Sequence, residues 1–257
     1  MALASSDLAI GENRFAFGIL DSALSPVRVP EATTTFVYLD STPQRVRANA
    51  KAEFIRWPAG RTGVYVANVS FDRSGRWGLV VEFMGEDDAL RVGRVGFVVD
   101  QESSSPMLGQ PAPLSRNKTA RDVSDLRDVT TALVPIPDLY QMTVSEAVSS
   151  GRPTVVTFAT PSFCQTATCG PQVTVVASLN EKYKGKANFI HIEVYDNPNE
   201  IEGDLSRGRL SPLLKEWGLL TEPFTFVLDG DGLVASKFEG FVTAKELEAA
   251  LAEVLPF

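Results

Sequence analysis

The two halves of this chain differ in their predicted secondary structure, and this contrast limits the possible folds more than any other feature. Up to about residue 100, short runs rich in Val, Phe, Tyr and Thr alternate apolar with polar residues, and turn residues separate them. Strands are predicted at 13–20, 33–39, 45–57, 63–71, 76–84 and 90–99. This spacing, without a helical segment, predicts an all-β antiparallel sandwich of immunoglobulin-like size over residues 1–103.

Residues 104–141 differ in composition from the segments on either side. Proline, serine and glutamine are frequent up to Pro113, and the stretch 119–131 carries charges with few large apolar residues. Such a composition is typical of an extended linker. The sequence therefore predicts a linker at 104–141 and a second domain at 142–257.

The second half alternates predicted strands with predicted helices. Thr143 is followed three residues later by Glu146, which is the pattern of a capping box at a helix start. Strands are then predicted at 153–158, 188–195, 224–228 and 233–238, and helices at 171–184, 211–217 and 243–255. This order predicts an α/β domain that ends in an antiparallel hairpin and a helix.

Composition excludes several classes of function. The chain is 44% hydrophobic and 22% charged, which is the balance of a globular protein. Its net charge of −8 argues against nucleic-acid binding, because no basic patch offsets the acidic residues. No stretch approaches the roughly 20 apolar residues that span a bilayer. The start of the chain shows no secretory signal, and a signal or membrane anchor removed before Met1 is compatible with this.

Three segments of the second half carry a resemblance to a known family. The run 155–164 leads from a strand to Phe163 and Cys164, the run 217–226 leads from a tryptophan through Glu222 and Pro223 into a strand, and the run 229–240 has the pattern of a hairpin. This order, with these residues at its joints, resembles thioredoxin over about 115 residues.

The resemblance implies specific roles for these residues. The cysteine pair Cys164 and Cys169 would exchange disulfides, and Pro223 would be a cis-proline that holds an extended substrate. Phe163 precedes Cys164 and Glu222 precedes Pro223, so both are candidates for contact with the substrate. The sequence also departs from the family. Four residues separate the cysteines instead of two, with no histidine among them, Thr157 or a neighbour stands where the family has a buried carboxylate, and Glu222 stands just before the proline.

The cysteine spacing sets a geometric condition. A helix start lowers the pKa of a nearby thiol, and the thiolate is the reactive form. Residues five apart in a regular helix have Cα atoms roughly 8 Å apart, which is beyond the reach of a disulfide. We therefore predict that residues 165–168 form a loop and that the helix starts no earlier than Cys169.

These observations favour an extracytoplasmic thiol–disulfide oxidoreductase that acts on protein thiols or disulfides, with no cofactor besides the cysteine pair. Two alternatives remain open. In the first, a static disulfide stiffens a non-catalytic binding module. The second is a thiol peroxidase, although the Pro-x-x-x-Thr-x-x-Cys pattern of peroxiredoxins is not matched around Cys164.

Other candidate residues have a functional and a structural interpretation. His191, the only histidine, is either a hydrogen-bonded or solvent-facing strand residue or a copper ligand beside the thiolates. The run 229–232, Asp-Gly-Asp-Gly, is a hairpin turn or part of a calcium loop, for which the other oxygen ligands are missing. Glu222 either faces solvent or moves protons near the sulfurs, and Phe163 either packs or binds. We predict no metal site.

Overall fold

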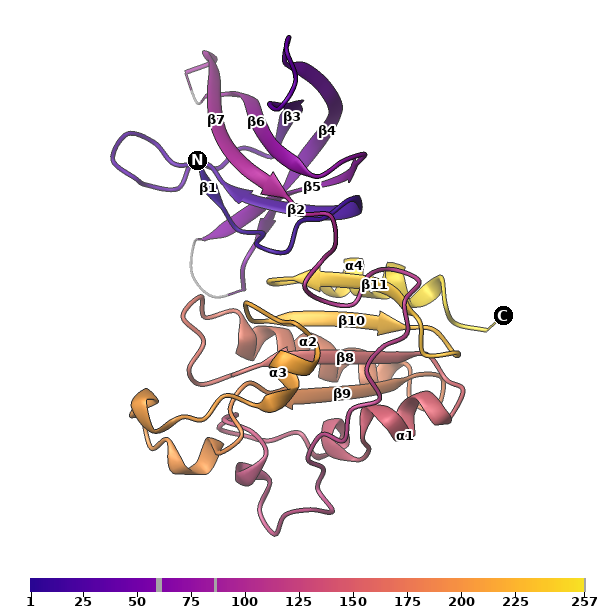
Figure 1. Cartoon of the computed structure of the whole chain (residues 1–257). Coiled ribbons are helices and arrows are strands. Elements are labelled where there is room, and N and C mark those ends of the chain that lie inside the picture. The colour runs from indigo at the N-terminus through magenta and orange to yellow at the C-terminus, as the bar shows by residue number, and fades with distance from the viewer. Residues whose placement is uncertain (59–61, 86, 257) are drawn as a thin grey trace. The chain divides into compact units, whose positions relative to one another are not determined.

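A computed structural model describes residues 1–58, 62–85 and 87–256. The chain separates into two compact units, Met1–Ser103 and Ser104–Phe257 (Figure 1). No helix in these described ranges combines the length and apolar character that a membrane crossing requires.

The first unit is all-β and antiparallel, as predicted. Its seven strands form one sheet in the order β1-β2-β5-β4-β3-β6-β7. The strands are β1 (Ala2–Leu3), β2 (Gly11–Gly18), β3 (Glu31–Tyr38), β4 (Arg45–Arg56), β5 (Gly63–Phe71), β6 (Gly75–Met84) and β7 (Leu90–Val99).

This sheet curls into a barrel-like shape around an aromatic core. The two sides that face each other across the core therefore belong to one sheet. Phe15 on β2 lies 5.2 Å from Phe36 on β3 and 4.9 Å from Phe97 on β7, measured between ring centroids, although neither strand is a neighbour of β2 in the sheet. An isolated parallel bridge between Ala9 and Asp100 joins the two ends of the sheet at one side. Edge-to-face aromatic pairs of this kind add to the free energy of burial.

The second unit is built on a four-stranded sheet in the order β11-β10-β8-β9. Strands β8 and β9 are parallel because α2 carries the chain back across one face, whereas β10 is antiparallel to both β8 and β11. The elements are η1 (Leu126–Asp128), η2 (Pro137–Tyr140), α1 (Val144–Ser149), β8 (Thr154–Ala159), α2 (Cys169–Lys182), β9 (Asn188–Glu193), η3 (Pro198–Glu200), η4 (Leu205–Arg207), α3 (Pro212–Glu216), β10 (Phe224–Leu228), β11 (Val234–Glu239) and α4 (Ala244–Ala252).

Each face of this sheet is covered. On one face Val155 and Val227 pack with Val176 of α2 and Leu247 of α4 in a single cluster of buried side chains. On the other face Phe158 and Phe226 pack with Trp217 and with residues of α1. Burial on both faces explains why β8 and β10 are almost uninterrupted runs of apolar and β-branched residues.

The strand order and connections give the second unit a thioredoxin-like fold. The central strand β8 leads directly to the cysteine loop, and α2 begins at that loop. The peptide bond between Glu222 and Pro223, just before β10, is cis, as the resemblance implies. The predicted capping box is also present, because Thr143 and Glu146 exchange the expected hydrogen bonds at the start of α1.

Residues 104–141, which the sequence analysis assigns to a linker, belong to the second unit in the structure. Pro111 forms a β-bridge with Leu233, and the hydroxyl of Ser115 accepts a hydrogen bond from the indole N–H of Trp217 at 2.8 Å. The segment also places buried residues in the core, among them Leu139 and Tyr140. Its few apolar residues are therefore spaced to cover the sheet edge at β9, which composition alone does not reveal.

Candidate active site

The two cysteines lie on either side of a helix start. Helix α2 begins at Cys169, with Thr168 as the residue before it, so the predicted limit on the helix start is confirmed. Residues 164–168 form a turn, in which the N–H of Ala167 donates to the carbonyl of Cys164 at 3.1 Å. Ala167 has a φ of 56°, in the left-handed region, which lets the loop fold back over so few residues.

Cys164 is half-buried, and its sulfur is surrounded by hydrogen-bond donors. The backbone N–H of Cys169 donates to Sγ at 3.3 Å, and the Thr166 hydroxyl lies 3.2 Å from it. The pKa of Cys164 is lowered to about 4, chiefly by a hydrogen bond from the Cys169 thiol, with further contributions from Thr166 and from backbone amides at the helix start. These donors stabilise the thiolate, which makes Cys164 the nucleophilic member of the pair.

Cys169 differs from its partner in both burial and charge. It has no exposed surface, and the pKa of its thiol is raised because it donates a hydrogen bond to Cys164 and is desolvated. The backbone of Thr160, the residue that follows β8, also hydrogen-bonds the Cys169 sulfur. A thiolate and a protonated thiol in contact form the arrangement from which disulfide exchange proceeds.

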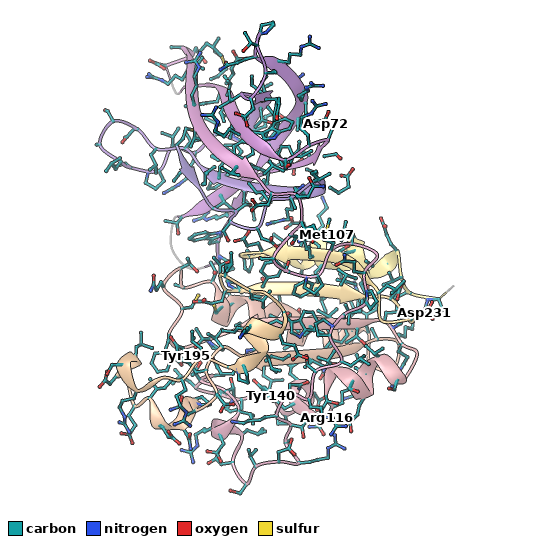
Figure 2. All side chains as sticks on the ribbon, viewed as in Figure 1. Asp72, Met107, Arg116, Tyr140, Tyr195 and Asp231 are labelled. Atoms are coloured by element: carbon teal, nitrogen blue, oxygen red, sulfur yellow. The ribbon has the colours of Figure 1, made fainter. Side chains whose placement is uncertain are left out.

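Glu222 and Phe163 lie at the rim of this site. The carboxylate of Glu222 is half-buried, and its pKa is raised first by burial and then by the negative charge of Cys164. Glu222 therefore lies within electrostatic reach of the nucleophilic sulfur. The ring of Phe163 makes an edge-on contact with Tyr195, at 6.2 Å between centroids, and is half-buried (Figure 2 labels Tyr195).

Thr157, which the sequence places where thioredoxins carry a buried carboxylate, forms a buried pair of hydroxyl groups with Thr225. Thr157 on β8 lies in register with Thr225 on β10 and with His191 on β9. The two threonine hydroxyls are 3.1 Å apart, and both side chains are fully buried. Neither hydroxyl can take up a proton near neutral pH, so this pair cannot replace a carboxylate.

A buried carboxylate that the sequence pattern did not single out lies two residue pairs further along β8 and β9, opposite Ala159. Glu193, at the end of β9, is 5% exposed, and its Oε2 accepts hydrogen bonds from the N–H of Thr131 at 2.7 Å and from its hydroxyl at 2.8 Å. Burial raises the pKa of Glu193 to about 7, against the opposing effect of these bonds and of one from Thr160. The Thr160 side chain hydrogen-bonds Glu193, and the Thr160 backbone hydrogen-bonds the Cys169 sulfur. Thr160 thus links the carboxylate to the buried thiol.

A small cavity of about 150 Å³ is lined in part by His191, Ile192 and Glu193 of β9. Its walls include Lys118, Tyr195 and Ser211. The cavity is large enough for a few water molecules, and its lining combines polar and apolar groups. Glu193 therefore borders this cavity and is also hydrogen-bonded to Thr160, which contacts the buried thiol.

His191 is hydrogen-bonded within the core and does not approach the cysteines as a ligand would. Its Nε2 donates to the carbonyl of Ala159 at 3.0 Å, so its Nδ1 accepts from the hydroxyl of Tyr140 at 2.7 Å (Figure 2 labels Tyr140). Burial lowers the pKa of His191 to about 4, so the ring is neutral. The structure favours the hydrogen-bonded interpretation of this histidine, because both ring nitrogens already have partners in the core.

The run 229–232 forms the hairpin turn between β10 and β11. The Asp229 carboxylate accepts hydrogen bonds from the N–H groups of Asp231 and Leu233, both at 2.9 Å. Within the described part of the chain, no group of three or more His, Cys, Asp or Glu side chains could hold a metal ion.

Comparisons with known proteins return solved structures alone. No family model and no curated protein matches the chain. A putative thiol:disulfide interchange protein DsbE from Chlorobium tepidum is 18% identical over 59% of this chain and 100% of its own, with a TM-score of 0.43. StoA from Bacillus subtilis is 18% identical over 39% of this chain and 82% of its own, with a TM-score of 0.31.

A third structure is the exposed lipoprotein thioredoxin of Streptococcus pneumoniae strain TIGR4. It is 18% identical over 41% of this chain and 89% of its own, with a TM-score of 0.31.

Proposed function

We propose that this protein is a thiol–disulfide oxidoreductase of thioredoxin-like type that acts on protein thiols or disulfides outside the cytoplasm. The observation that carries the proposal is the contact between a stabilised thiolate at Cys164, in the turn before α2, and a buried thiol at Cys169, the first residue of α2. A binding module that used its cysteines only as a brace would not need a thiol with a pKa near 4 at the protein surface.

The first chemical step uses Cys164. Its thiolate attacks one sulfur of a substrate disulfide, a bond forms between the enzyme and that sulfur, and the other substrate sulfur leaves as a thiolate. Donors around the Cys164 sulfur hold its charge before the attack. Once the sulfur is neutral in the mixed disulfide, the Cys169 thiol loses the acceptor of its hydrogen bond and becomes easier to deprotonate.

The second step uses Cys169. Its thiolate attacks the Cys164 sulfur, a disulfide forms within the enzyme, and the second substrate sulfur leaves as a thiolate that takes up a proton. Two electrons have then passed from the cysteine pair to the substrate. The same steps in reverse oxidise a dithiol substrate.

Glu193 supplies a place for the proton that Cys169 must release. Its raised pKa, near 7, matches a group that alternates between acid and base at neutral pH. Its link to Thr160 brings it near the thiol, and the small cavity at β9 lets the proton reach water. This carboxylate supports the proposal because it supplies the function that Thr157 cannot.

Glu222 and Pro223 are proposed to hold the substrate. Glu222 lies within electrostatic reach of the Cys164 sulfur and lines a groove together with Leu210, Leu214, Leu219 and Leu220. An extended peptide can lie along such a groove with an apolar side chain inserted. We assign Phe163, the residue before Cys164, to the same surface. A location outside the cytoplasm is proposed because stable disulfide chemistry is concentrated there.

The test is to measure the redox state of the pair and the turnover of a protein disulfide together. Alkylation gel shifts in glutathione buffers should show the pair cycling between dithiol and disulfide, and insulin reduction should be lost in Cys164→Ser. Cys169→Ser should accumulate a mixed disulfide with substrate. Thr174→Ala, on the exposed side of α2, serves as the control and should leave both measurements unchanged.

A pair that stays oxidised at every buffer potential, with no insulin reduction, would instead establish the non-catalytic module. Consumption of hydrogen peroxide at rates above those of insulin reduction would establish the peroxidase.

A further inference from the structure

Strand β7 in the first unit lies at one edge of its sheet. It pairs with β6 over its full length, from Met84 opposite Leu90 to Gly75 opposite Val99, and the described residues provide no strand on its other side (Figure 1). Edge strands of this length are usually shortened, covered or interrupted by charges that prevent pairing.

The register shows which backbone groups of β7 are unpaired. In an antiparallel pair, alternate residues direct both backbone groups to the partner strand. The hairpin closes with a bond from the N–H of Gly85 to the carbonyl of Ala89, so odd-numbered residues of β7 face β6. Even-numbered residues therefore direct their N–H and C=O groups away from the sheet; they are Leu90, Val92, Arg94, Gly96 and Val98.

Asp100 confirms this alternation. Its N–H donates to the carbonyl of Leu8 at 2.9 Å, and its carbonyl accepts from the N–H of Ile10 at 3.1 Å. Both groups of this even-numbered residue thus bond on the side away from β6. Pairing on this side is limited to Asp100, which follows the strand. The edge of β7 itself, residues 90–99, has no partner strand among the described residues.

A cleft of about 1120 Å³ lies along the unpaired part of β7. Its lining includes residues 90–94 of β7 and residues 26–29, which precede β3. Ile19 and Phe83, both buried, provide an apolar lining. The cleft therefore combines free backbone groups with an apolar interior.

Positive charge predominates among the described residues of the lining. The three arginines are Arg28, Arg91 and Arg94, and the two carboxylates are Asp21 and Asp87.

Both carboxylates already have partners. Asp87 pairs with Arg91 at 2.8 Å, and Asp21 accepts two backbone N–H bonds within its own loop. Arg28 and Arg94 form no ion pair in the described part of the chain.

These features select one kind of occupant. An extended peptide satisfies both the N–H and the C=O groups of an edge strand, whereas a fatty acid or a free anion satisfies donors alone. A second copy of β7 would bring Arg91 and Arg94 against like charges, because the strand carries no carboxylate. Acidic side chains on the bound strand would instead pair with Arg94, which lies on the outer face with Val92 and Val98.

We propose that the first unit binds an extended acidic segment of a partner polypeptide, which adds to β7 as a further strand within this cleft. Apolar side chains of the segment enter the cleft, and its carboxylates face Arg94 and Arg28. This binding site is separate from the cysteine chemistry and does not depend on it.

The experiment uses the full chain and a fluorescently labelled eight-residue peptide that alternates Val with Glu, with binding followed by anisotropy. Two further peptides carry N-methyl groups on alternate residues, one on each edge of the extended backbone. One isomer should bind at least tenfold more weakly than the parent, because its methyl groups block the bonds to β7, and the other should bind like the parent.

Charge variants complete the test. Arg94→Glu should weaken binding at least tenfold, and Arg45→Glu, an exposed arginine at the start of β4, should leave it unchanged. Equal binding of the two methylated isomers would overturn the proposal, because pairing along an edge requires a difference. It would also be overturned by the absence of peptide binding, by binding of dodecanoate in place of the peptide, or by dimerisation of the chain through β7.

Discussion

Glu193 and Thr131 are joined by two hydrogen bonds to one carboxylate oxygen, which tie the end of β9 to a segment 62 residues earlier in the chain. Thr131 also contacts the active-site loop, because its hydroxyl accepts a bond from the N–H of Ser162 at 3.2 Å and its carbonyl accepts from the Ser162 hydroxyl. The Glu193 carboxylate therefore holds Thr131 in place, and Thr131 in turn holds the loop that leads to Cys164. The same carboxylate is hydrogen-bonded to Thr160.

Replacing Glu193 by Gln should slow the second chemical step and leave the first unchanged. Gln keeps an oxygen for Thr131 but cannot take a proton from Cys169, so resolution of the mixed disulfide should be about 10- to 100-fold slower at pH 7. Its dependence on pH around 7 should also disappear. Stopped-flow measurement of mixed-disulfide decay tests this, with Glu253→Gln as an exposed control. An unchanged decay rate and pH profile would exclude a proton-transfer role.

The alkylation rate of Cys164 should follow its low pKa. Iodoacetamide should modify it at a nearly constant rate from pH 6 to pH 8 and lose half of that rate near pH 4, because the thiolate is the reacting form. Thr166→Ala removes a donor to the sulfur and should raise this midpoint, whereas Thr174→Ala should not. A midpoint near that of an ordinary thiol, about 8.5, would contradict the described contacts.

Gly218 should tolerate no side chain, because a Cβ built there would lie 1.8 Å from the carbonyl oxygen of Ser104. Gly151 offers a matched control, since both glycines have positive φ but the Cβ of Gly151 would meet nothing within 4 Å. Gly151→Ala should cost about 1 kcal/mol from backbone strain alone. Gly218→Ala should cost at least twice as much, as measured by urea unfolding. Equal costs would show that the backbone of Ser104 does not pack against Gly218.

Much of this fold follows from local sequence patterns. Alternating apolar residues predict the strands of the first unit, and the βα order with Cys164, Pro223 and the closing hairpin predicts the second. The start of α2 at Cys169 follows from the geometry of a disulfide across five residues. These features depend on interactions between residues close in sequence, which is why a single sequence carries them.

The role of residues 104–141 and the environment of Glu193 depend on contacts between distant segments. The charged end of β9 has the pattern of an exposed strand end, and only the packing of residues 129–131 buries it. The sequence of β9 does contain one indication that Glu193 is buried. His191 and Glu193 lie among the apolar residues Phe189, Ile190 and Ile192, so the strand could be covered on both faces. Both polar side chains would then be buried and would need hydrogen-bond partners.

The two buried titratable groups of β9 should have opposite effects on stability as pH changes. Glu193 has a pKa of about 7 in the folded protein against an ordinary value of 4.5, so the folded state binds more protons between these values and loses stability as pH rises. His191 has a folded pKa of about 4 against 6.5, so the unfolded state binds more protons and stability rises with pH. Each effect is on the order of 3 kcal/mol for such buried groups.

The two effects should nearly cancel between pH 4.5 and 6.5, so the free energy of unfolding of the second unit should be almost flat there. Glu193→Gln should expose the histidine effect, with stability rising by roughly 3 kcal/mol from pH 4 to pH 6.5. His191→Gln should show the reverse, a loss from pH 4.5 to pH 7. Carboxylates held by arginine, such as Asp125 with a pKa of about 2, titrate below this window. Urea unfolding of both variants at four pH values tests these predictions. If the free energy of unfolding changed with pH in the same way in the two variants, the buried positions of both groups would be contradicted.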